Sequence, residues 1–477
     1  MGRRFFLTLM TVAVLLGSAA GQERFRQNAP PPEPWPDVRL PRLESNTLKF
    51  GLPVTVVFRE PSPVMSLHLI ISAGEQSSPD KLPGLASLAS GIFGQGTQLH
   101  SSAEIEEQIE RIGGSFSALA DRDCILIAFH FLEENLDQAL DLLAEMILLP
   151  RIGDREIKIV QSVISSELTA RERDPVFVGN RILGSLLFRG HPYEKYAFGR
   201  SSIRNWTVRD LQDFWDKNIR PNNSQVILAG AVNINIATRK ISHALGTWAP
   251  RELPRPALPP PRPPDKDRVC FIDLPQSRQV AISVGTVLPP LVPAERFAMM
   301  TLCRLLGGSI NSRLFLNLRE SKSFAYETGS RPEFYRAGGT FRASAVVRPE
   351  VTAASVREIL SEIRRLAREP ATTDEISDAK SNILGGFPLQ LDRFDEFSGY
   401  IAAMKASGAG EEIWSRFPAN ILAVDAASVL QTAQKYLSQP LLTVIAGSRE
   451  LCREALAEFD EVEIFDARGQ YLETLKK

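Results

Sequence analysis

The sequence has few cysteines, few histidines and no excess of charge of either sign. The cysteines show no CxxC or other metal-type spacing, which argues against a compact metal or redox site. Their apolar surroundings favour buried, unpaired side chains, although an exported chain can also pair four cysteines in three ways. They are Cys124, Cys270, Cys303 and Cys452.

The balance of 55 basic and 56 acidic residues gives a formal net charge of -1. Nucleic-acid and anionic-membrane partners usually demand a basic excess, so this balance argues against both. A length of 477 residues favours two domains, and the 44% hydrophobic content is ordinary for a globular protein.

The N-terminus has the pattern of an export signal. A charged start with Arg3 and Arg4 precedes a short apolar run, and small residues at 18–20 offer a cleavage site. We therefore predict a signal peptide over residues 1–20 and a periplasmic or secreted protein. The paired arginines also resemble a twin-arginine signal, but a general-secretion signal is favoured. No later apolar run is long enough to span a membrane.

Proline-rich stretches divide the remaining chain. Residues 21–43 are a predicted tether and residues 250–267 a predicted inter-domain linker, because several prolines cannot enter a helix or sheet. The two parts on either side, residues 44–249 and 268–465, repeat one plan, and residues 466–477 are a predicted tail. In each part a strand leads into an amphipathic helix, at Cys124–His130 before Glu134–Ile147 and at Phe341–Val347 before Val351–Arg364. With no glycine-rich phosphate loop, this repeat predicts a duplicated α+β domain.

Residues 44–465 resemble the pitrilysin/insulinase family of zinc metallopeptidases, the inverzincins related to processing peptidases. The resemblance rests on the order and spacing of several segments, among them residues 82–97, 104–116, 168–175 and 191–193. It implies two homologous domains of the LuxS/MPP-like metallopeptidase type, each a mainly antiparallel sheet packed with helices. Family members carry His-x-x-Glu-His on the first helix, where two histidines hold zinc and the glutamate activates water. Here the corresponding positions are Ser87, Ser90 and Gly91.

The family's third zinc ligand corresponds to Glu167, 76 positions after Gly91. A single carboxylate does not hold Zn²⁺, so Glu167 is interpreted as an ordinary helix glutamate. The two serines have no nucleophile-elbow sequence and no evident base, and are interpreted as small polar fillers. No histidine pairs with another ligand at helical spacing; they are His68, His100, His130, His191 and His243. We therefore expect no catalytic residue and no bound metal in this chain alone.

The second half keeps a family motif that supplies substrate-binding residues. Residues 305–326 are similar to the stretch in which an arginine and a tyrosine bind the peptide backbone and support the developing oxyanion. The matching residues are Arg319 and Tyr326, whose donors suit a peptide carbonyl that gains charge. Without the surrounding motif, an ion-paired arginine and a packed tyrosine would be the simpler interpretation. Ser323 and Phe324 stand where the family has a glycine.

Some bacterial members divide these parts between two chains, and this chain has the pattern of the chain without zinc. The resemblance therefore implies a non-catalytic, substrate-binding subunit that forms a heterodimer with a zinc-bearing paralogue and takes an extended peptide substrate. The main alternative is a structural or peptide-binding pseudoenzyme with no role in proteolysis. An independent peptidase with an unorthodox metal site is the least favoured interpretation.

Overall fold

The computed structural model describes residues 41–477, except 59–62, 254–257, 393, 411–412 and 414. The predicted signal peptide, residues 1–20, and nearly all of the predicted tether, residues 21–43, lie outside the described residues. Within the described part, every helix is too short or too polar to cross a membrane.

The first half of the chain builds a six-stranded sheet with the order β1-β2-β6-β3-β5-β4. Only β2 and β6 are parallel, and all other neighbours are antiparallel. The strands are β1 (Leu43–Thr47), β2 (Pro53–Phe58), β3 (Val64–Ile71), β4 (Ser115–Ala120), β5 (Ile125–Leu132) and β6 (Ser224–Gly230). Strand β4 is therefore a sheet edge.

The second half builds a seven-stranded sheet with the order β13-β12-β7-β11-β8-β10-β9. Its run β7-β11-β8-β10-β9 repeats the run β2-β6-β3-β5-β4 strand for strand, including one parallel pair at the same place. The strands are β7 (Arg268–Asp273), β8 (Val280–Leu288), β9 (Ala325–Tyr335), β10 (Gly338–Val347), β11 (Leu442–Gly447), β12 (Glu461–Phe465) and β13 (Tyr471–Lys476). The predicted duplicated α+β fold with mainly antiparallel sheets is confirmed.

Each sheet has helices on both faces. The helices of the first half are α2 (Leu85–Ile92), α3 (Ser102–Arg111), α4 (Leu136–Leu148), α5 (Asp154–Arg171), α6 (Pro175–Leu187), α7 (Arg200–Ile203), α8 (Val208–Asn218) and α9 (Ile234–Leu245). Those of the second half are α10 (Pro293–Gly307), α11 (Thr352–Arg368), α12 (Thr373–Asp392), α13 (Phe394–Ala406), α15 (Phe417–Ala423), α16 (Ala426–Leu437) and α17 (Arg453–Leu456).

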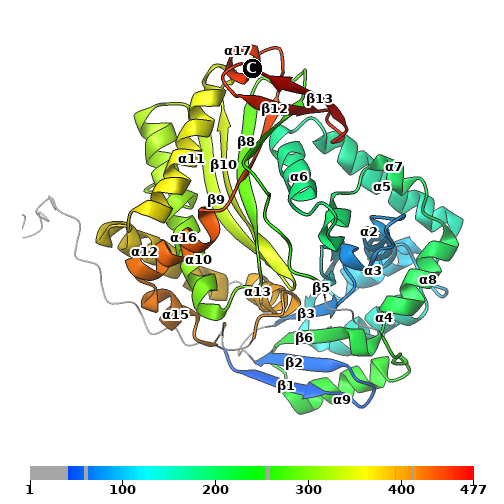
Figure 1. The fold of residues 1–477 in the computed structure, drawn as a ribbon. Helices are drawn as coiled ribbons and strands as arrows, with labels where there is room; N and C mark the ends of the chain where they lie inside the picture. Colours follow the sequence, from blue (N-terminus) through cyan, green and yellow to red (C-terminus); the bar gives the residue numbers. More distant parts are fainter. Residues whose placement is uncertain (1–40, 59–62, 254–257, 393, 411–412, 414) are drawn as a thin grey trace, which may run out of the picture. The chain divides into compact units, whose positions relative to one another are not determined.

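Two helices are exchanged between the halves. Helix α6 belongs to the first half but packs on β8 and β11 of the second sheet, opposite the face covered by α10 and α11 (Figure 1). Helix α13 belongs to the second half but packs on β3 and β6 of the first sheet. The exchange means that neither sheet is covered by its own half of the chain alone.

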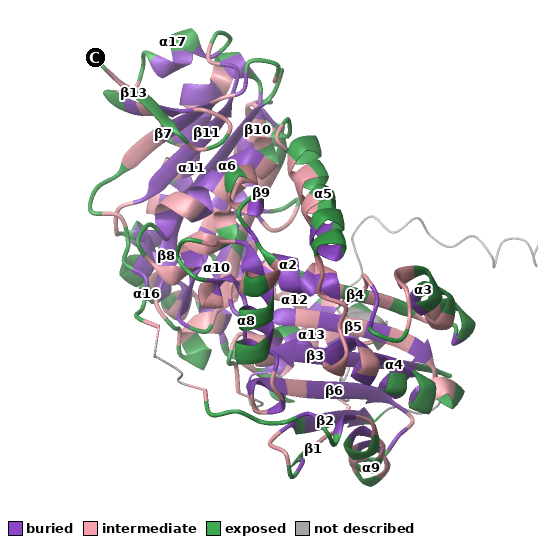
Figure 2. Cartoon of the chain, turned by 90° about the vertical axis from the view of Figure 1, so that its right-hand side faces the viewer, coloured by how far each residue is buried: buried purple, intermediate pink, exposed green. Residues whose placement is uncertain are grey.

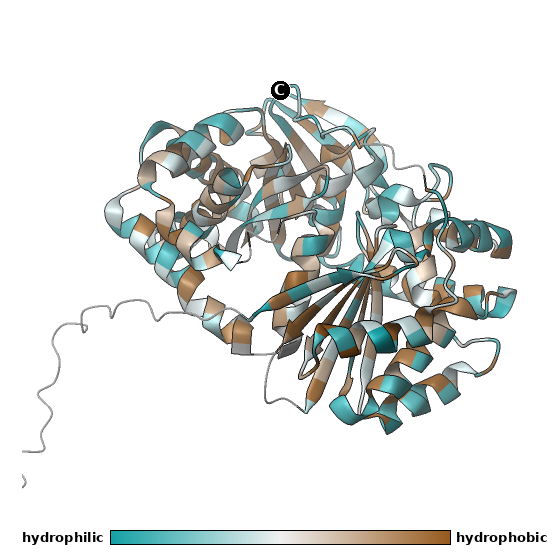
Figure 3. Ribbon diagram, turned by 90° about the horizontal axis from the view of Figure 1, so that it is seen from below, coloured by the Kyte–Doolittle hydropathy of each residue, from teal (hydrophilic) through white to brown (hydrophobic). Residues whose placement is uncertain are grey.

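Along β3, buried side chains alternate between the two faces of the first sheet, which explains why helices cover both faces. Met65, Leu67 and Leu69 join the hydrophobic core under α2 and α4, whereas Ser66 and His68 between them hydrogen-bond toward Ser398 of α13. Side chains along a strand point to opposite faces in turn, so both sets are buried. Figure 3 views the molecule from the side of this sheet and shows mostly hydrophobic strands beside helices with one hydrophilic side.

The domain boundaries remain predictions, but two segments near them are described. Those residues of the predicted linker 250–267 that are described form neither helix nor strand. The predicted tail, residues 466–477, differs from expectation because it contains β13, whose backbone pairs with β12 in antiparallel register. All four cysteines are buried and unpaired, as predicted.

A buried hydrogen-bond network joins the two halves at Tyr193, in the His-Pro-Tyr loop. Its hydroxyl donates to Asp123 Oδ1 at 2.6 Å and accepts from the amide of Ala337 at 2.9 Å. The other oxygen of Asp123 accepts from the amide of Arg336 at 2.8 Å. His191 supports the loop by accepting from the Tyr193 amide at 3.1 Å and donating to the carbonyl of Pro259 at 2.8 Å. These contacts give the loop a structural role.

Replacing Tyr193 with Phe is expected to lower the free energy of unfolding by about 2–3 kcal/mol, because the Ala337 amide and the Asp123 carboxylate each lose a buried partner. Urea unfolding followed by circular dichroism measures this loss. The exposed Tyr471→Phe is the control and should change stability by less than about 0.5 kcal/mol. Equal losses in the two variants would contradict a structural role for the Tyr193 hydroxyl.

Candidate functional site

The positions that correspond to the zinc site line one cavity of about 760 Å³. Ser87, Ser90 and Gly91 contribute from α2, and Glu167 contributes from α5. Residues 118–120 of the edge strand β4 form another wall, and residues of β9 and β10 also line the cavity. The structure thus gathers all four positions around one space, while their role stays a prediction.

Helix α2 begins on a buried carboxylate, that of Glu75. Its Oε2 accepts from the Gly84 amide at 2.9 Å and from Ser78 Oγ at 2.8 Å, and its Oε1 accepts from the Ser87 amide at 2.8 Å and from Ser87 Oγ at 2.6 Å. A helix leaves its first amides without partners, and Glu75 supplies two of them with an acceptor. Burial raises the pKa of Glu75, although its hydrogen bonds oppose the shift.

Ser87 therefore has a carboxylate within hydrogen-bond reach, which the sequence did not indicate. That carboxylate already accepts four hydrogen bonds. Two of them come from backbone amides at the start of the helix, which have no acceptor within the helix. Ser90 donates to the carbonyl of Ser87 at 2.9 Å, as serines within helices often do. We interpret both serines as structural parts of α2.

The residues at the zinc positions do not fit Zn²⁺. A serine hydroxyl is not among the usual nitrogen, sulfur and carboxylate ligands, and Gly91 has no side chain. A Cβ at Gly91 would lie 2.5 Å from Val160 Cγ1 of α5, so Val160 takes part of the space that a histidine there would need. Nowhere in the described ranges do three or more His, Cys, Asp or Glu side chains gather as metal ligands.

Glu167 lies on the exposed part of α5. Figure 2 shows most of this helix as exposed or intermediate, with buried residues only near its start. No hydrogen bond or ion pair engages the Glu167 side chain in the described part of the chain. It is an exposed helix residue at the cavity rim, and its interpretation as an ordinary helix glutamate stays a prediction.

Arg319 and Tyr326 lie next to each other but do not line this cavity. Arg319 belongs to a π-helical segment, Phe315–Ser321, and its Nη1 donates to the carbonyl of Tyr326 at 3.1 Å. The guanidinium also lies over the ring of Phe315, 5.0 Å from its centroid. Tyr326 stands near the start of β9 with 57% of its surface exposed. Both donors are therefore available to a partner molecule.

Ser323 stands near the position of the family's glycine and has a backbone conformation that favours glycine. Its φ of 53° lies in the left-handed region, which glycine adopts without cost. A non-glycine residue there costs about 1 kcal/mol, and the flanking bonds hold it in place. The Ser323 amide donates to the carbonyl of Arg319 at 3.2 Å, and the Phe324 amide donates to that of Leu318 at 2.7 Å. The loop thus keeps the conformation that a glycine would favour.

The sequence interpretation missed several charged residues of the cavity, among them Arg122, Glu333 and Arg342. Arg122 is far from the other two in the chain and none of the three belongs to a motif, so only the fold brings them together. The alternation of Arg331, Glu333 and Tyr335 along one strand was the available signal, since residues two apart share a face.

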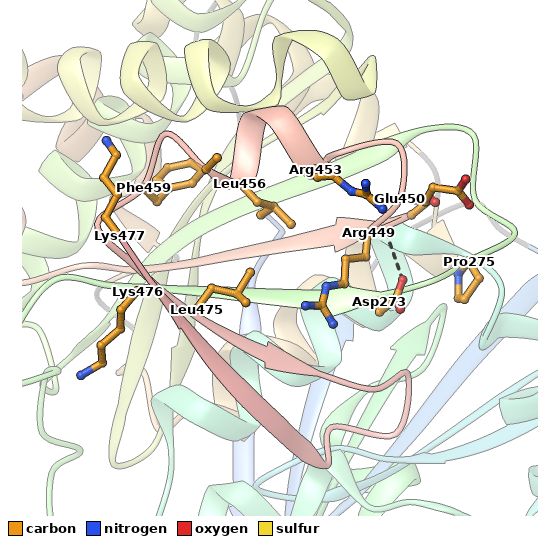
Figure 4. Close-up of a pocket in the computed structure, with 12 residues that line it drawn as sticks. Asp273, Pro275, Arg449, Glu450, Arg453, Leu456, Phe459, Leu475, Lys476 and Lys477 are labelled. Atoms are coloured by element: carbon orange, nitrogen blue, oxygen red, sulfur yellow. Dashed lines mark hydrogen bonds between the residues drawn. The ribbon is translucent and has the colours of Figure 1, made fainter.

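A second cavity, of about 700 Å³, is lined by residues of α17, of the end of β13 and of the loops after β7 and β11 (Figure 4). None of the predicted site residues lines it. Arg449 donates through its amide to Asp273 Oδ1 at 3.1 Å and pairs with Glu473 at 2.7 Å. These contacts hold the C-terminal hairpin on the sheet, and the cavity is a consequence of that packing.

Comparisons with known proteins agree with the fold. Residues 54–199 match the family described as "Insulinase (Peptidase family M16)", and residues 205–383 match "Peptidase M16 inactive domain". An uncharacterized zinc protease of Mycobacterium tuberculosis is 25% identical over 350 residues, which cover 72% of this chain and 80% of that protein.

The solved structures that resemble the chain include two proteases. A protease from Helicobacter pylori superposes with a TM-score of 0.79 at 21% identity, covering 86% of this chain and all of the other. The periplasmic protease PqqL from Escherichia coli has a TM-score of 0.71 at 15% identity, covering 91% of this chain and 50% of that one. At these identities the structures support the fold alone. The sequence matches extend through both halves, and the chain belongs to the insulinase family, peptidase family M16.

Proposed function

We propose that this chain is the non-catalytic, substrate-binding subunit of an exported heterodimeric zinc peptidase. Arg319 and Tyr326 complete the active site of a zinc-bearing partner of the same family, which holds the metal and the activated water. The observation that carries the proposal is the position of these two residues. Arg319 is hydrogen-bonded to Tyr326, both are exposed, and neither lines the cavity that lacks zinc ligands.

The edge strand β4 supports a role in peptide binding. No described strand pairs with the outer side of β4, and its residues 118–120 border the cavity. An extended peptide can pair with such an edge by main-chain hydrogen bonds. Leu119 on this strand is an exposed apolar side chain of the kind that contacts a bound peptide. The chain would then hold the peptide, and the partner would cleave it.

A location in the periplasm or outside the cell is part of the proposal. It is supported by the signal-like start of the sequence and by the periplasmic description of the similar protease PqqL. In such a compartment the two subunits would meet after export.

Mixing the purified chain with a family paralogue that carries His-x-x-Glu-His is expected to form a one-to-one complex. It should also produce hydrolysis of an extended peptide that neither chain shows alone. Size-exclusion chromatography measures the complex, and a fluorogenic peptide measures hydrolysis. A stable complex without any gain in hydrolysis would favour the alternative, a structural or peptide-binding pseudoenzyme. Stoichiometric zinc in the purified single chain would contradict the division of roles.

A further inference from the structure

Three arginines lie near the carboxylate of Glu333, in the part of the cavity that residues of β9 and β10 line. Arg331 lies 3.0 Å from Glu333 and Arg342 lies 3.8 Å from the same oxygen. Arg122 donates to the hydroxyl of Tyr335 at 3.0 Å, and that hydroxyl donates to the other oxygen of Glu333. One negative charge therefore stands against three positive charges. We call Arg122, Arg331 and Arg342 the arginine cluster.

The register of the sheet places two of these charges directly opposite each other. Arg342 of β10 is the cross-strand partner of Arg331 of β9. Like charges at such a position destabilise a sheet, so this pair is not explained by folding alone. Burial and the neighbouring Arg331 lower the pKa of Arg342, in keeping with an excess of positive charge.

The arginine cluster also has unused hydrogen-bond donors. The Arg342 side chain is only 14% exposed and makes no hydrogen bond to any described residue. The Nε of Arg122 is buried and, among the described atoms, has no partner. The Arg122 guanidinium is surrounded by the rings of Phe188, Tyr196 and Tyr335, with 4.5 to 5.1 Å between their centroids and its carbon. Such ring contacts use the face of a guanidinium and leave its donors to other groups.

Among the described residues, the other acids of the cavity make no ion pair with the arginine cluster. Asp121 accepts hydrogen bonds from the amides of Asp123 and Cys124, and Asp174 caps the start of α6 through the Val176 amide. Glu167 is exposed on α5. Glu333 is thus the one acid that pairs with the arginine cluster in the described part of the cavity, so three positive charges face a single paired carboxylate.

From this arrangement we infer that the arginine cluster is a subsite for a carboxylate of the bound peptide. The inference rests on the proposed peptide-binding function and adds a substrate class to it. Arg122 follows β4 by two residues, so a peptide paired with that edge strand passes the cluster. Guanidinium groups suit a carboxylate because their N–H donors match its two oxygens. The carboxylate belongs to an acidic side chain or to the C-terminus of the peptide.

The test uses the full chain and three fluorescent peptides of one backbone sequence. The first has a glutamate side chain and an amidated C-terminus, the second has neutral side chains and a free C-terminus, and the third is neutral and amidated. Fluorescence anisotropy is expected to give a Kd about tenfold or more lower for the first or second peptide than for the third. Which of the two binds tightly identifies the source of the carboxylate.

Arg342→Gln and Arg331→Gln are expected to remove this preference and to leave the Kd of the neutral peptide unchanged. Arg331 is 63% exposed, so its replacement keeps the test valid if Arg342→Gln fails to fold. Arg209→Gln, at a position of α8 that is 90% exposed and outside the cavity, removes the same charge and should keep the preference. Equal binding of all three peptides to the natural chain would overturn the inference and leave peptide binding intact. Binding of none of them would overturn both.

Discussion

Replacing Tyr326 with Phe in the reconstituted pair is expected to lower kcat for peptide hydrolysis by about 10²–10³-fold with little change in KM. In the proposed heterodimer, the hydroxyl would donate to the oxygen that gains negative charge as the peptide carbonyl is attacked. A donor of this kind acts mainly in the transition state, so its loss appears in kcat.

The Tyr326 hydroxyl has no hydrogen-bond partner among the described residues and the ring is largely exposed, so the replacement removes no described hydrogen bond within the chain. Phenylalanine should therefore leave folding and complex formation unchanged. Arg319→Ala should act differently, since it removes a donor for the substrate and also the bond to the Tyr326 carbonyl. We expect it to raise KM as well as lower kcat.

The measurement is steady-state hydrolysis by complexes purified at equal stoichiometry. Tyr471→Phe is the matched control, because Tyr471 is 58% exposed on β13. If Tyr326→Phe and Arg319→Ala both form the complex and hydrolyse the peptide at the natural rate, the proposed sharing of an active site is wrong.

The duplicated fold was predictable because its signals are local. The segment 124–147 and its counterpart 341–364 each show a strand period followed by a helical period, and the structure has β5 with α4 and β10 with α11 there. The exchange of α6 and α13 was not predictable in this way. Nothing in the apolar pattern of a helix states which sheet it will cover, and each helix packs on the sheet that the other half supplies.

The candidate site was predictable only where a motif marks it. Ser87, Ser90, Gly91 and Glu167 were found because the sequence around them resembles the family's zinc motif, and the fold brings them to one cavity. Glu75 and Arg342 have no motif. Their importance depends on burial and on contacts with distant residues, such as the cross-strand pair of Arg342 with Arg331. A single sequence does not display such contacts.

Replacing Glu75 with Ala is expected to lower the free energy of unfolding by about 3–5 kcal/mol near neutral pH. The change removes a fully buried carboxylate, so the amides of Gly84 and Ser87 lose their acceptor and two hydroxyl groups lose their partner. The start of α2, with the cavity wall that it forms, should be the first part to loosen.

The loss in free energy of unfolding caused by Glu75→Ala should also depend on pH. Whether it grows or shrinks with rising pH is determined by the raised pKa of Glu75, whose ordinary value is 4.5. A group whose pKa is higher in the folded state contributes its full stability below its unfolded pKa and loses it as the pH rises through the folded pKa. Alanine has no such dependence. The difference in stability between the natural chain and Glu75→Ala should therefore be largest at acidic pH and narrow as the pH rises.

Urea unfolding between about pH 4 and about pH 8 measures this difference. Asn233→Ala is the matched control, because Asn233 caps α9 through the Ile236 amide and carries no titratable group. Asn233→Ala should lower the free energy of unfolding by about 1 kcal/mol, and this loss should not vary with the titration of Glu75. A difference for Glu75→Ala that widens with rising pH would show that the four hydrogen bonds outweigh burial. Glu75 would then be a carboxylate that α2 holds ionised, and the buried start of this helix would be stabilised by charge.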